Sequence, residues 1–188
     1  YYSKNYDPEG LAMPYMETPS LAQQARIKMG PYFTKMIADL VEAKSLIPTG
    51  ITDLNRVNLP TANGLHARIA LYMRDWATAE TQASAFISAI PLATIAEFPG
   101  IWTDENTKEL SFRIIRTTAV GGRIGSLFRG VTAQGQIGTI SWAPSGKLWD
   151  SYDKVNDIRF NSYLIDEPLL VAANRPSRLV NKYKGTGY

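Results

Sequence analysis

The sequence predicts a mainly α-helical protein with a loop-rich second half that carries a few short strands. Apolar residues recur with the helical period between residues 32 and 43 and again between 61 and 90. Six glycines fall between residues 117 and 142, where almost no period remains. Proline and glycine separate short apolar runs between 91 and 116. These observations place the helices first along the chain and the loops after them.

The N-terminal residues 1–19 are predicted to form an extended arm, because they are rich in Tyr, Pro and Met and show no period. Ser20–Gln23 fits a capping box, in which the serine oxygen satisfies a free backbone amide. A helix is therefore expected to follow it. Gly30 and Pro31 should kink or restart that helix, because proline lacks an amide donor and clashes with the preceding turn.

From Tyr32 onward the sequence predicts one amphipathic helix, which Pro48 and Gly50 should end. Asp39, Glu42 and Lys44 lie off its apolar stripe. The stripe consists of Phe33, Met36, Ile37, Leu40 and Ala43.

Residues 61–90 are predicted to form two antiparallel helices joined by a tight turn. Their apolar positions are Leu65, Ile69 and Met73 in the first helix and Ala79, Ala83, Phe86 and Ile90 in the second. Arg74 and Asp75 should form the turn, and Trp76 is expected to enter the groove between the helices. Small residues at contact positions favour close packing, as in a tetratricopeptide-type helical pair. Such pairs build scaffolds, which favours binding over chemistry.

Three short elements are expected in the remaining residues. Leu110–Ile115 has the β-branched and aromatic content of a strand, a short helix is expected around Ser145–Tyr152, and a second strand near Leu179–Tyr183. Residues 160–188 otherwise read as loop. The glycine-rich segment 117–142 is a long loop, and loops of more than about 15 residues are usually functional or disordered.

We interpret residues 1–188 as a single fragment of one domain. Residues 1–90 would form its helical scaffold, and residues 91–188 its loop-rich, ligand-binding side. The chain starts at Tyr1 instead of Met and ends in a loop-like segment, so we expect it to be a piece of a longer protein.

Composition and charge exclude several classes of protein. The net charge is only +3, and no Lys/Arg run exceeds two residues, so no nucleic-acid partner is predicted. The absence of cysteine removes disulfides, thiolate catalysis and cysteine-bound metals. No apolar run approaches the length of about 18 residues that a membrane span needs, and no signal peptide is recognised.

No catalytic or metal-binding motif is recognised, so the protein is predicted to be neither an enzyme nor dependent on a metal or cofactor. His66 has no ligand at suitable spacing and should be a packing or surface residue. Asp104–Glu105 and Asp166–Glu167 are sequence neighbours that cannot face one site. The acidic residues between Asp150 and Asp157 miss the spacing of a calcium loop. Gly121–Gly125 lacks the Lys-Ser/Thr of a phosphate loop.

Aromatic residues outside the periodic helices are the remaining candidates for function. An indole or phenol ring can stack on the apolar face of a sugar, while amides and guanidinium groups bind its hydroxyls. Trp102 and Trp149 have apolar neighbours and are expected to be core anchors, whereas Trp142 fits either role equally well. The predicted ligand-binding residues are Trp142, Phe128, Arg129 and Gln134, with Gln136 beside them.

Short groups of residues follow one another in a characteristic order across nearly all of residues 1–184. They are Met36-Ile-Ala-Asp39-Leu40-x-x-Ala43 with Ile47-Pro48; Ala67-Arg68-x-x-Leu71-Tyr72-x-x-Asp75-Trp76-x-x-Ala79; Ile101-Trp102 with Glu109-Leu-Ser-Phe112; Pro144-Ser145-x-x-Leu148-x-x-x-Tyr152; and Asp157-x-Arg159 with Lys182-Tyr183-Lys184. In order and spacing these groups resemble the RagB/SusD family of bacterial outer-membrane nutrient-binding lipoproteins.

The resemblance implies a SusD-like α-α superhelix of tetratricopeptide-like pairs cradling a loop-rich region. It also implies a surface-exposed outer-membrane lipoprotein, held by a lipid anchor outside these residues, which works with a SusC-type TonB-dependent transporter. Members capture glycans, or in some cases peptides, and are not catalytic. In this chain Asp75 and Trp76 should fix the helical pair, and Asp157 and Arg159 should form a local ion pair.

The sequence therefore predicts a non-catalytic glycan-binding protein of a polysaccharide-uptake system. Two alternatives remain open: a helical structural adaptor of the transporter complex, and a binder of peptides instead of glycans. The family's ligand-binding aromatic residues lie in variable loops, so the four candidate residues rest on the sugar-stacking argument alone.

Overall fold

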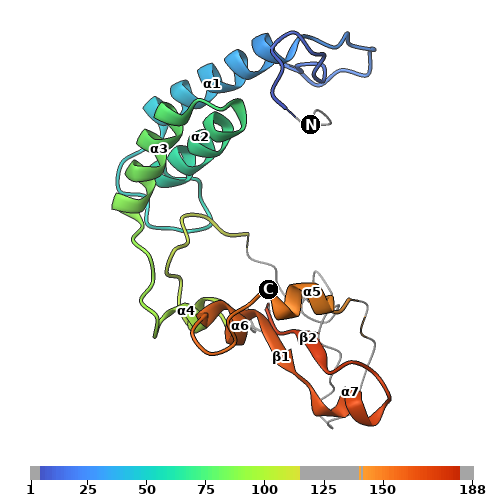
Figure 1. Ribbon diagram of the computed structural model, residues 1–188. Coiled ribbons are helices and arrows are strands. Elements are labelled where there is room, and N and C mark those ends of the chain that lie inside the picture. The colour runs from blue at the N-terminus through green and yellow to red at the C-terminus, as the bar shows by residue number, and fades with distance from the viewer. Residues whose placement is uncertain (1–4, 115–139, 141, 183–188) are drawn as a thin grey trace. The chain divides into compact units, whose positions relative to one another are not determined.

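The computed structural model describes residues 5–114, 140 and 142–182. The chain forms two compact units, which are described separately. Unit 1 comprises Tyr1–Ile90 together with Ser111–Arg113, and unit 2 comprises Pro91–Leu110 together with Ile114–Tyr188. Helices dominate the described residues, which confirms the predicted fold class (Figure 1). Among those residues, no helix combines the length and the apolar character that crossing a bilayer requires.

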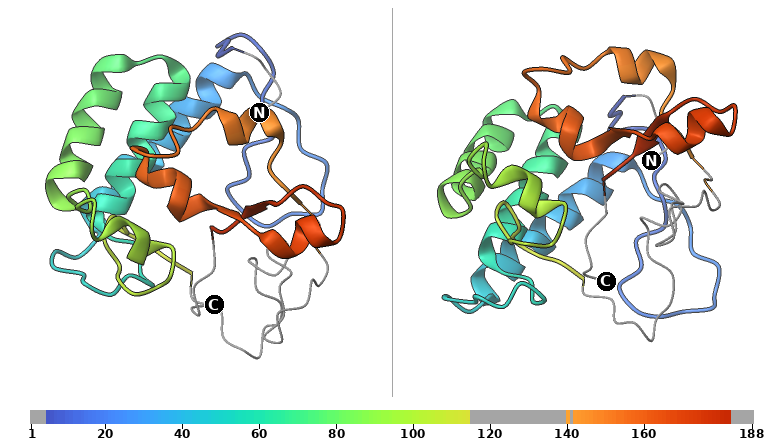
Figure 2. Two further views of the ribbon diagram at one scale, coloured as in Figure 1. Left: turned by 60° about the horizontal axis from the view of Figure 1, so that its bottom comes forward. Right: turned by 90° about the horizontal axis from the view of Figure 1, so that it is seen from below.

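Unit 1 is built on three helices, α1 (Met29–Leu46), α2 (Leu59–Met73) and α3 (Trp76–Ala89), which lie side by side (Figures 1 and 2). The predicted apolar stripe of α1 is its less exposed face. Helix α1 ends before Pro48 and Gly50, as expected from the sequence. Gly50 adopts a positive φ of 77°, which glycine tolerates at no steric cost.

The helical pair α2–α3 is confirmed, and its ends are capped by short polar side chains. The Asn58 side chain accepts a hydrogen bond from the Thr61 amide at the start of α2. Two residues make the turn: Arg74 is left-handed with φ of 63°, and the Asp75 carboxylate accepts from the Thr78 amide at the start of α3. Asp75 therefore fixes the turn, as the sequence predicted.

The buried face of the α2–α3 pair is lined mostly by small residues. It consists of Ala62, His66, Ile69 and Ala70 on α2 and Ala79 on α3. A Cβ placed on Gly64 would lie 3.0 Å from the Phe86 ring, so this glycine lets the two helices approach closely. Close approach of the backbones is what stabilises the pair.

Two details of the predicted pair are wrong. Leu65 is 50% exposed, because the buried face of α2 consists of Ala62, His66, Ile69 and Ala70, which keeps Ile69 of the predicted stripe but not Leu65. Trp76 is 62% exposed and lies at the first position of α3, so it does not fill the groove between the helices. Between the two helices the Phe86 ring, not an indole, packs against Gly64.

The predicted helix after Ser20 is also wrong. The Ser20 hydroxyl accepts from the Ala22 amide, a local turn that competes with helix formation. Residues 11–28 instead form a loop closed by an isolated bridge between Leu11 and Lys28. Pro31 therefore lies in the first turn of α1, where its missing amide costs nothing, and it kinks no helix.

Unit 2 contains short elements around one strand pair (Figure 1). The elements are α4 (Phe98–Ile101), α5 (Gly146–Asp150), α6 (Ile158–Tyr163), β1 (Leu164–Asp166), α7 (Pro168–Ala172) and β2 (Arg178–Val180). Strands β1 and β2 are antiparallel, with Ile165 opposite Leu179. Leu179 is fully buried, and Leu164 and Leu170 are also buried.

The sequence predictions for this unit are correct in part. The helix near Ser145–Tyr152 is confirmed as α5, and the second strand is found as β2, slightly earlier than expected. The strand predicted at Leu110–Ile115 is wrong for residues 110–114, which are irregular. The loop prediction for residues 160–188 overlooked most of α6, β1 and α7.

Gly100 is a site where the structure predicts a large effect of a small change. A Cβ at this position would lie 2.4 Å from the side-chain amide nitrogen of Asn106. This nitrogen donates a hydrogen bond to the Glu97 carbonyl. We expect Gly100→Ala to lower the free energy of unfolding by about 1–3 kcal/mol, because the new methyl group would displace the Asn106 side chain and break its hydrogen bond to the Glu97 carbonyl. Urea titration measures this change. Gly146→Ala is the control, because its nearest neighbours would be 3.9 Å away, and an equal loss in both variants would contradict the prediction.

Candidate functional site

Of the four predicted ligand-binding residues, Trp142 is the one that the structure describes. Its side chain is 65% exposed, although Pro144, two residues later, is buried. Ser145 then caps α5 by accepting from the Leu148 amide. Trp142 is therefore a surface aromatic residue held close to an ordered element. Phe128, Arg129 and Gln134 lie outside the described residues, so their grouping with Trp142 stays a prediction.

The other aromatic residues of unit 2 pack in two groups. Trp102 meets Tyr163 edge to face at a centroid distance of 5.0 Å, and Phe98 lies 6.1 Å from Trp102. Trp149 meets Phe160 at 4.8 Å. These contacts agree with the prediction that Trp102 and Trp149 anchor irregular segments. Neither ring has the exposure of Trp142.

Cationic side chains cover these aromatic groups. The Lys182 ammonium lies 4.1 Å from the centroid of Trp102 and 4.5 Å from that of Tyr163. The Lys154 ammonium lies 5.7 Å from the centroid of Trp149. Cation–π attraction therefore links the segment after β2 to the first group and stabilises both.

Asp157 and Arg159 form the predicted ion pair, with 2.6 Å between carboxylate and guanidinium. The same carboxylate also accepts from the Arg159 amide at the start of α6. Arg159 lowers the pKa of Asp157, and the carboxylate in turn raises the pKa of Arg159. Asp157 therefore caps α6, and its carboxylate is already engaged by Arg159.

The acidic residues between Asp150 and Asp157 are engaged by donors of the chain itself. The Asp153 carboxylate accepts from the amides of Val155 and Asn156, and Asp150 pairs with Lys154 at 3.2 Å. A hydrogen bond from the Asn156 side-chain amide, together with these two backbone bonds, lowers the pKa of Asp153. Across the described residues, no group of three His, Asp or Glu side chains is arranged to hold a metal ion.

His66 lies in unit 1 and is buried, as the packing alternative predicted. Its Nδ1 atom is 3.0 Å from the Lys44 ammonium, which also donates to the Gln82 amide oxygen at 2.5 Å. Burial lowers the pKa of His66, and the positive charge of Lys44 lowers it further. Neutral His66 thus accepts from Lys44, and this polar cluster joins α1, α2 and α3.

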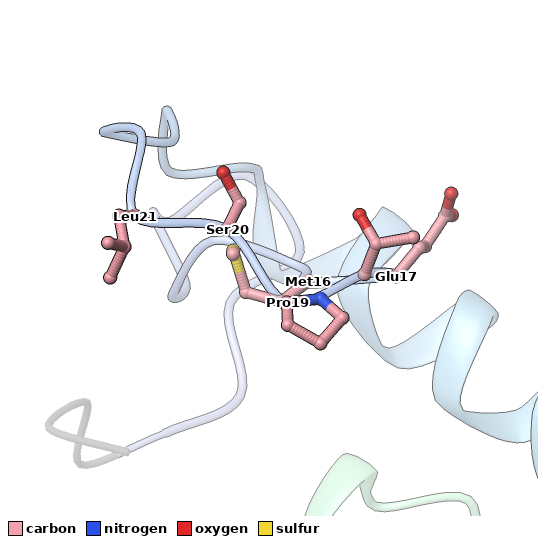
Figure 3. Close-up of a pocket in the computed structure, with 6 residues that line it drawn as sticks. Met16, Glu17, Pro19, Ser20 and Leu21 are labelled. Carbon is pink, nitrogen blue, oxygen red and sulfur yellow. The ribbon is translucent and has the colours of Figure 1, made fainter.

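An open depression of about 580 Å³ lies in the N-terminal loop of unit 1 (Figure 3). It is lined by six consecutive residues, Met16, Glu17, Thr18, Pro19, Ser20 and Leu21. Its carboxylate, Glu17, is already paired with Lys35 at 2.5 Å. No aromatic ring lines it, so it does not have the composition expected of a sugar site.

One residue beside the start of α5, the helix that follows Trp142, was missed by the sequence analysis. The guanidinium of Arg178 on β2 lies 3.9 Å from the position that a Cβ on Gly146 would occupy. Its Nε atom is buried and makes no hydrogen bond within the described part of the chain. No motif marks Arg178 in the sequence, because its approach to Gly146 depends on tertiary structure.

Comparison with known proteins supports the fold of the chain. No family model and no curated protein matches the sequence. Among solved structures, a SusD superfamily protein from Bacteroides vulgatus ATCC 8482 matches 95% of this chain and 41% of its own length, with 21% identity and a TM-score of 0.71. A laminarin binding SusD-like protein matches 91% of this chain and 46% of its own length, with 17% identity and a TM-score of 0.66.

A third solved structure, a SusD-like carbohydrate binding protein from Bacteroides vulgatus ATCC 8482, matches 60% of this chain with 22% identity and a TM-score of 0.52. The chain spans 25% of the length of this third structure and less than half of the other two. The resemblance predicted from the sequence is confirmed at the level of fold. The chain therefore has the fold of the corresponding part of SusD-superfamily proteins.

Proposed function

We propose that this chain is part of a non-catalytic protein that binds glycans. The observation that supports this most is the fold it shares, over 91% of its length, with a laminarin binding SusD-like protein. The exposed indole of Trp142 agrees with it, because an uncovered aromatic face can stack on a sugar ring. Trp142 is the proposed stacking residue, with Phe128, Arg129 and Gln134 as its partners.

The glycan would pass to a SusC-type TonB-dependent transporter at the outer-membrane surface. The protein would be a lipoprotein whose lipid anchor lies outside these residues. The SusD-like fold supports this wider proposal. Hydrolysis would need a free carboxylate as an acid or base. Acidic side chains of unit 2 instead pair with cations or cap helices, as Asp157 does, which supports a binding role. A polysaccharide that releases no reducing sugar on incubation with the protein would agree with that role.

Replacing Trp142 with alanine should abolish most glycan binding. Loss of a stacking residue at a binding site costs about 2 kcal/mol, which corresponds to a roughly thirtyfold weaker affinity. Affinity gels cast with a panel of polysaccharides measure this as lost retardation. Trp76→Ala is the matched control, because Trp76 has nearly the same exposure, 62%, but lies in unit 1.

Each outcome of this experiment has a separate meaning. Retardation that Trp142→Ala loses and Trp76→Ala keeps would support the function and the site. Retardation kept by both variants would leave the function standing and contradict the role of Trp142. A protein that no glycan retards would contradict glycan binding and favour a peptide ligand.

A structural adaptor is a second candidate, because the three helices of unit 1 expose many apolar side chains. These are Val41, Leu46, Leu65, Leu71, Trp76 and Ile87. Exposed apolar side chains on helices are typical of protein-binding surfaces. Saturable binding to the transporter, without any response to glycans, would favour this candidate over the first.

A further inference from the structure

The guanidinium of Arg178 has donors that the described part of the chain does not use. Arg178 begins β2 and faces Asp166 in the register of the strand pair, yet no ion pair joins their side chains. Its Nε atom is buried without an acceptor among the described residues. Arg178 as a whole is half-buried, so its terminal Nη atoms, for which no acceptor is found among the described residues, are the donors that a ligand can reach.

This guanidinium lies at the start of the helix that follows the proposed stacking residue. Its atoms are 3.9 Å from the position that a Cβ on Gly146 of α5 would occupy. Trp142 precedes Gly146 by four residues, so their Cα atoms are at most about 14 Å apart. A short oligosaccharide stacked on Trp142 can therefore reach Arg178.

The local charge favours an anionic ligand. Lys147 follows Gly146, is exposed, and makes no ion pair with the described residues. Arg178 and Lys147 thus place two positive charges beside α5. Two carboxylates oppose these charges: Asp166, which faces Arg178 across the strand pair and is exposed to solvent, and Asp150 on α5, which is paired with Lys154. Solvent screens the repulsion between Asp166 and an anionic ligand strongly. It weakens a direct hydrogen bond between the ligand and the guanidinium much less.

We propose that the glycan bound at Trp142 carries uronic acids, and that Arg178 binds a uronate carboxylate while Trp142 stacks on a sugar ring. The planar guanidinium fork matches the two oxygens of a carboxylate. This inference rests on the proposed glycan-binding function and names the class of glycan. Arg178 would then determine whether an acidic or a neutral chain is bound.

Calorimetry with matched oligosaccharides tests the inference. The probes are oligogalacturonate and alginate oligosaccharides, the methyl ester of the former, and a neutral laminarin oligosaccharide. We expect Arg178→Gln to weaken binding of an acidic oligosaccharide by about ten- to a hundredfold, the range for a hydrogen bond to a charged group, and to leave neutral ligands unchanged. Asp166→Asn should strengthen acidic binding, because it removes a negative charge that repels the ligand.

Arg68→Gln is the control, since Arg68 is an exposed cation on α2 of unit 1. Circular dichroism of each variant verifies that it folds, and Arg178→Lys, which keeps the charge but loses the fork, should bind acidic ligands with intermediate affinity. Equal binding of acidic and neutral oligosaccharides, unchanged in Arg178→Gln, would overturn the inference and leave glycan binding intact. Binding of neutral oligosaccharides alone would overturn it as well. Binding of no oligosaccharide would overturn both proposals.

Discussion

Replacing Leu179 with alanine is expected to lower the free energy of unfolding of unit 2 by about 2–5 kcal/mol. Leu179 is 0% exposed and lies on β2, opposite Ile165 of β1. Leu164 and Leu170 are also buried in this unit. Truncation would leave a cavity that the short surrounding elements cannot fill without losing their own contacts. Because typical domains have only about 5–15 kcal/mol of stability, this loss could unfold the unit.

Urea titration followed by tryptophan fluorescence measures this effect, since Trp102 and Trp149 report on the same unit. Leu169→Ala is the matched control, because it removes the same atoms from a neighbouring side chain that is 38% exposed. The control should cost clearly less than Leu179→Ala. Equal losses in the two variants would contradict the assignment of Leu179 to the core.

Unit 1 is expected to lose stability as the pH falls below about 6.5, the ordinary pKa of histidine. Burial and the positive charge of Lys44 lower the pKa of His66 in the folded state. In this range the unfolded chain therefore binds more protons than the folded chain. Stability consequently rises with pH, is fully present above 6.5, and is lost as the pH falls towards the folded pKa. Protonated His66 would face the Lys44 ammonium across 3.0 Å and could no longer accept from it.

His66→Gln tests this prediction, because glutamine can accept from Lys44 but does not titrate. Urea titrations at several pH values between about 5 and 7.5 should show a slope for the natural chain and a flatter one for the variant. Among the carboxylates of unit 1, hydrogen bonds from Thr78 lower the pKa of Asp75 below its ordinary value, so its contribution is lost only at a lower pH than that of His66. Identical slopes in both chains would contradict the prediction.

The helices of unit 1 could be predicted because their information is local. A stripe at helical spacing, Pro48 after α1 and Asp75 before α3 each act within a few residues. The buried face of α2 was harder to predict from the sequence, since both Leu65 and His66 are compatible with a helix. The close approach at Gly64 decides between them, and it involves Phe86, more than twenty residues away. Periodicity therefore predicts the presence of a helix better than it predicts which face of the helix is buried.

The short elements of unit 2 illustrate where local information ends. Leu110–Phe112 has strand-like composition but pairs with no strand among the described residues, whereas Leu164–Asp166 is a strand because β2 returns beside it. Strand formation depends on a partner, so composition alone misleads. Ser20 does not begin a helix for a related reason, because its hydroxyl accepts a hydrogen bond from the Ala22 amide in a local turn.

The candidate site could be predicted only in part. An exposed Trp142 agrees with the sugar-stacking argument, which requires a ring that the core does not use. Arg178 could not be found, because its position beside Gly146 depends on the strand pair and on α5 together. A loop aromatic residue can be proposed from its neighbours in sequence, but a guanidinium partner from a distant strand cannot.

The two-residue turn between α2 and α3 also bears on how the protein is made and how it varies. Because Arg74 and Asp75 join the helices directly, every contact between α2 and α3 connects residues within one stretch of the chain, Leu59 to Ala89. Chains with local contacts fold early and quickly, so this pair can form during synthesis before residues 91–188 emerge. Substitutions around Trp142 can then accumulate without disturbing an already assembled scaffold. Such independence allows one framework to acquire new ligands by changes in its later residues.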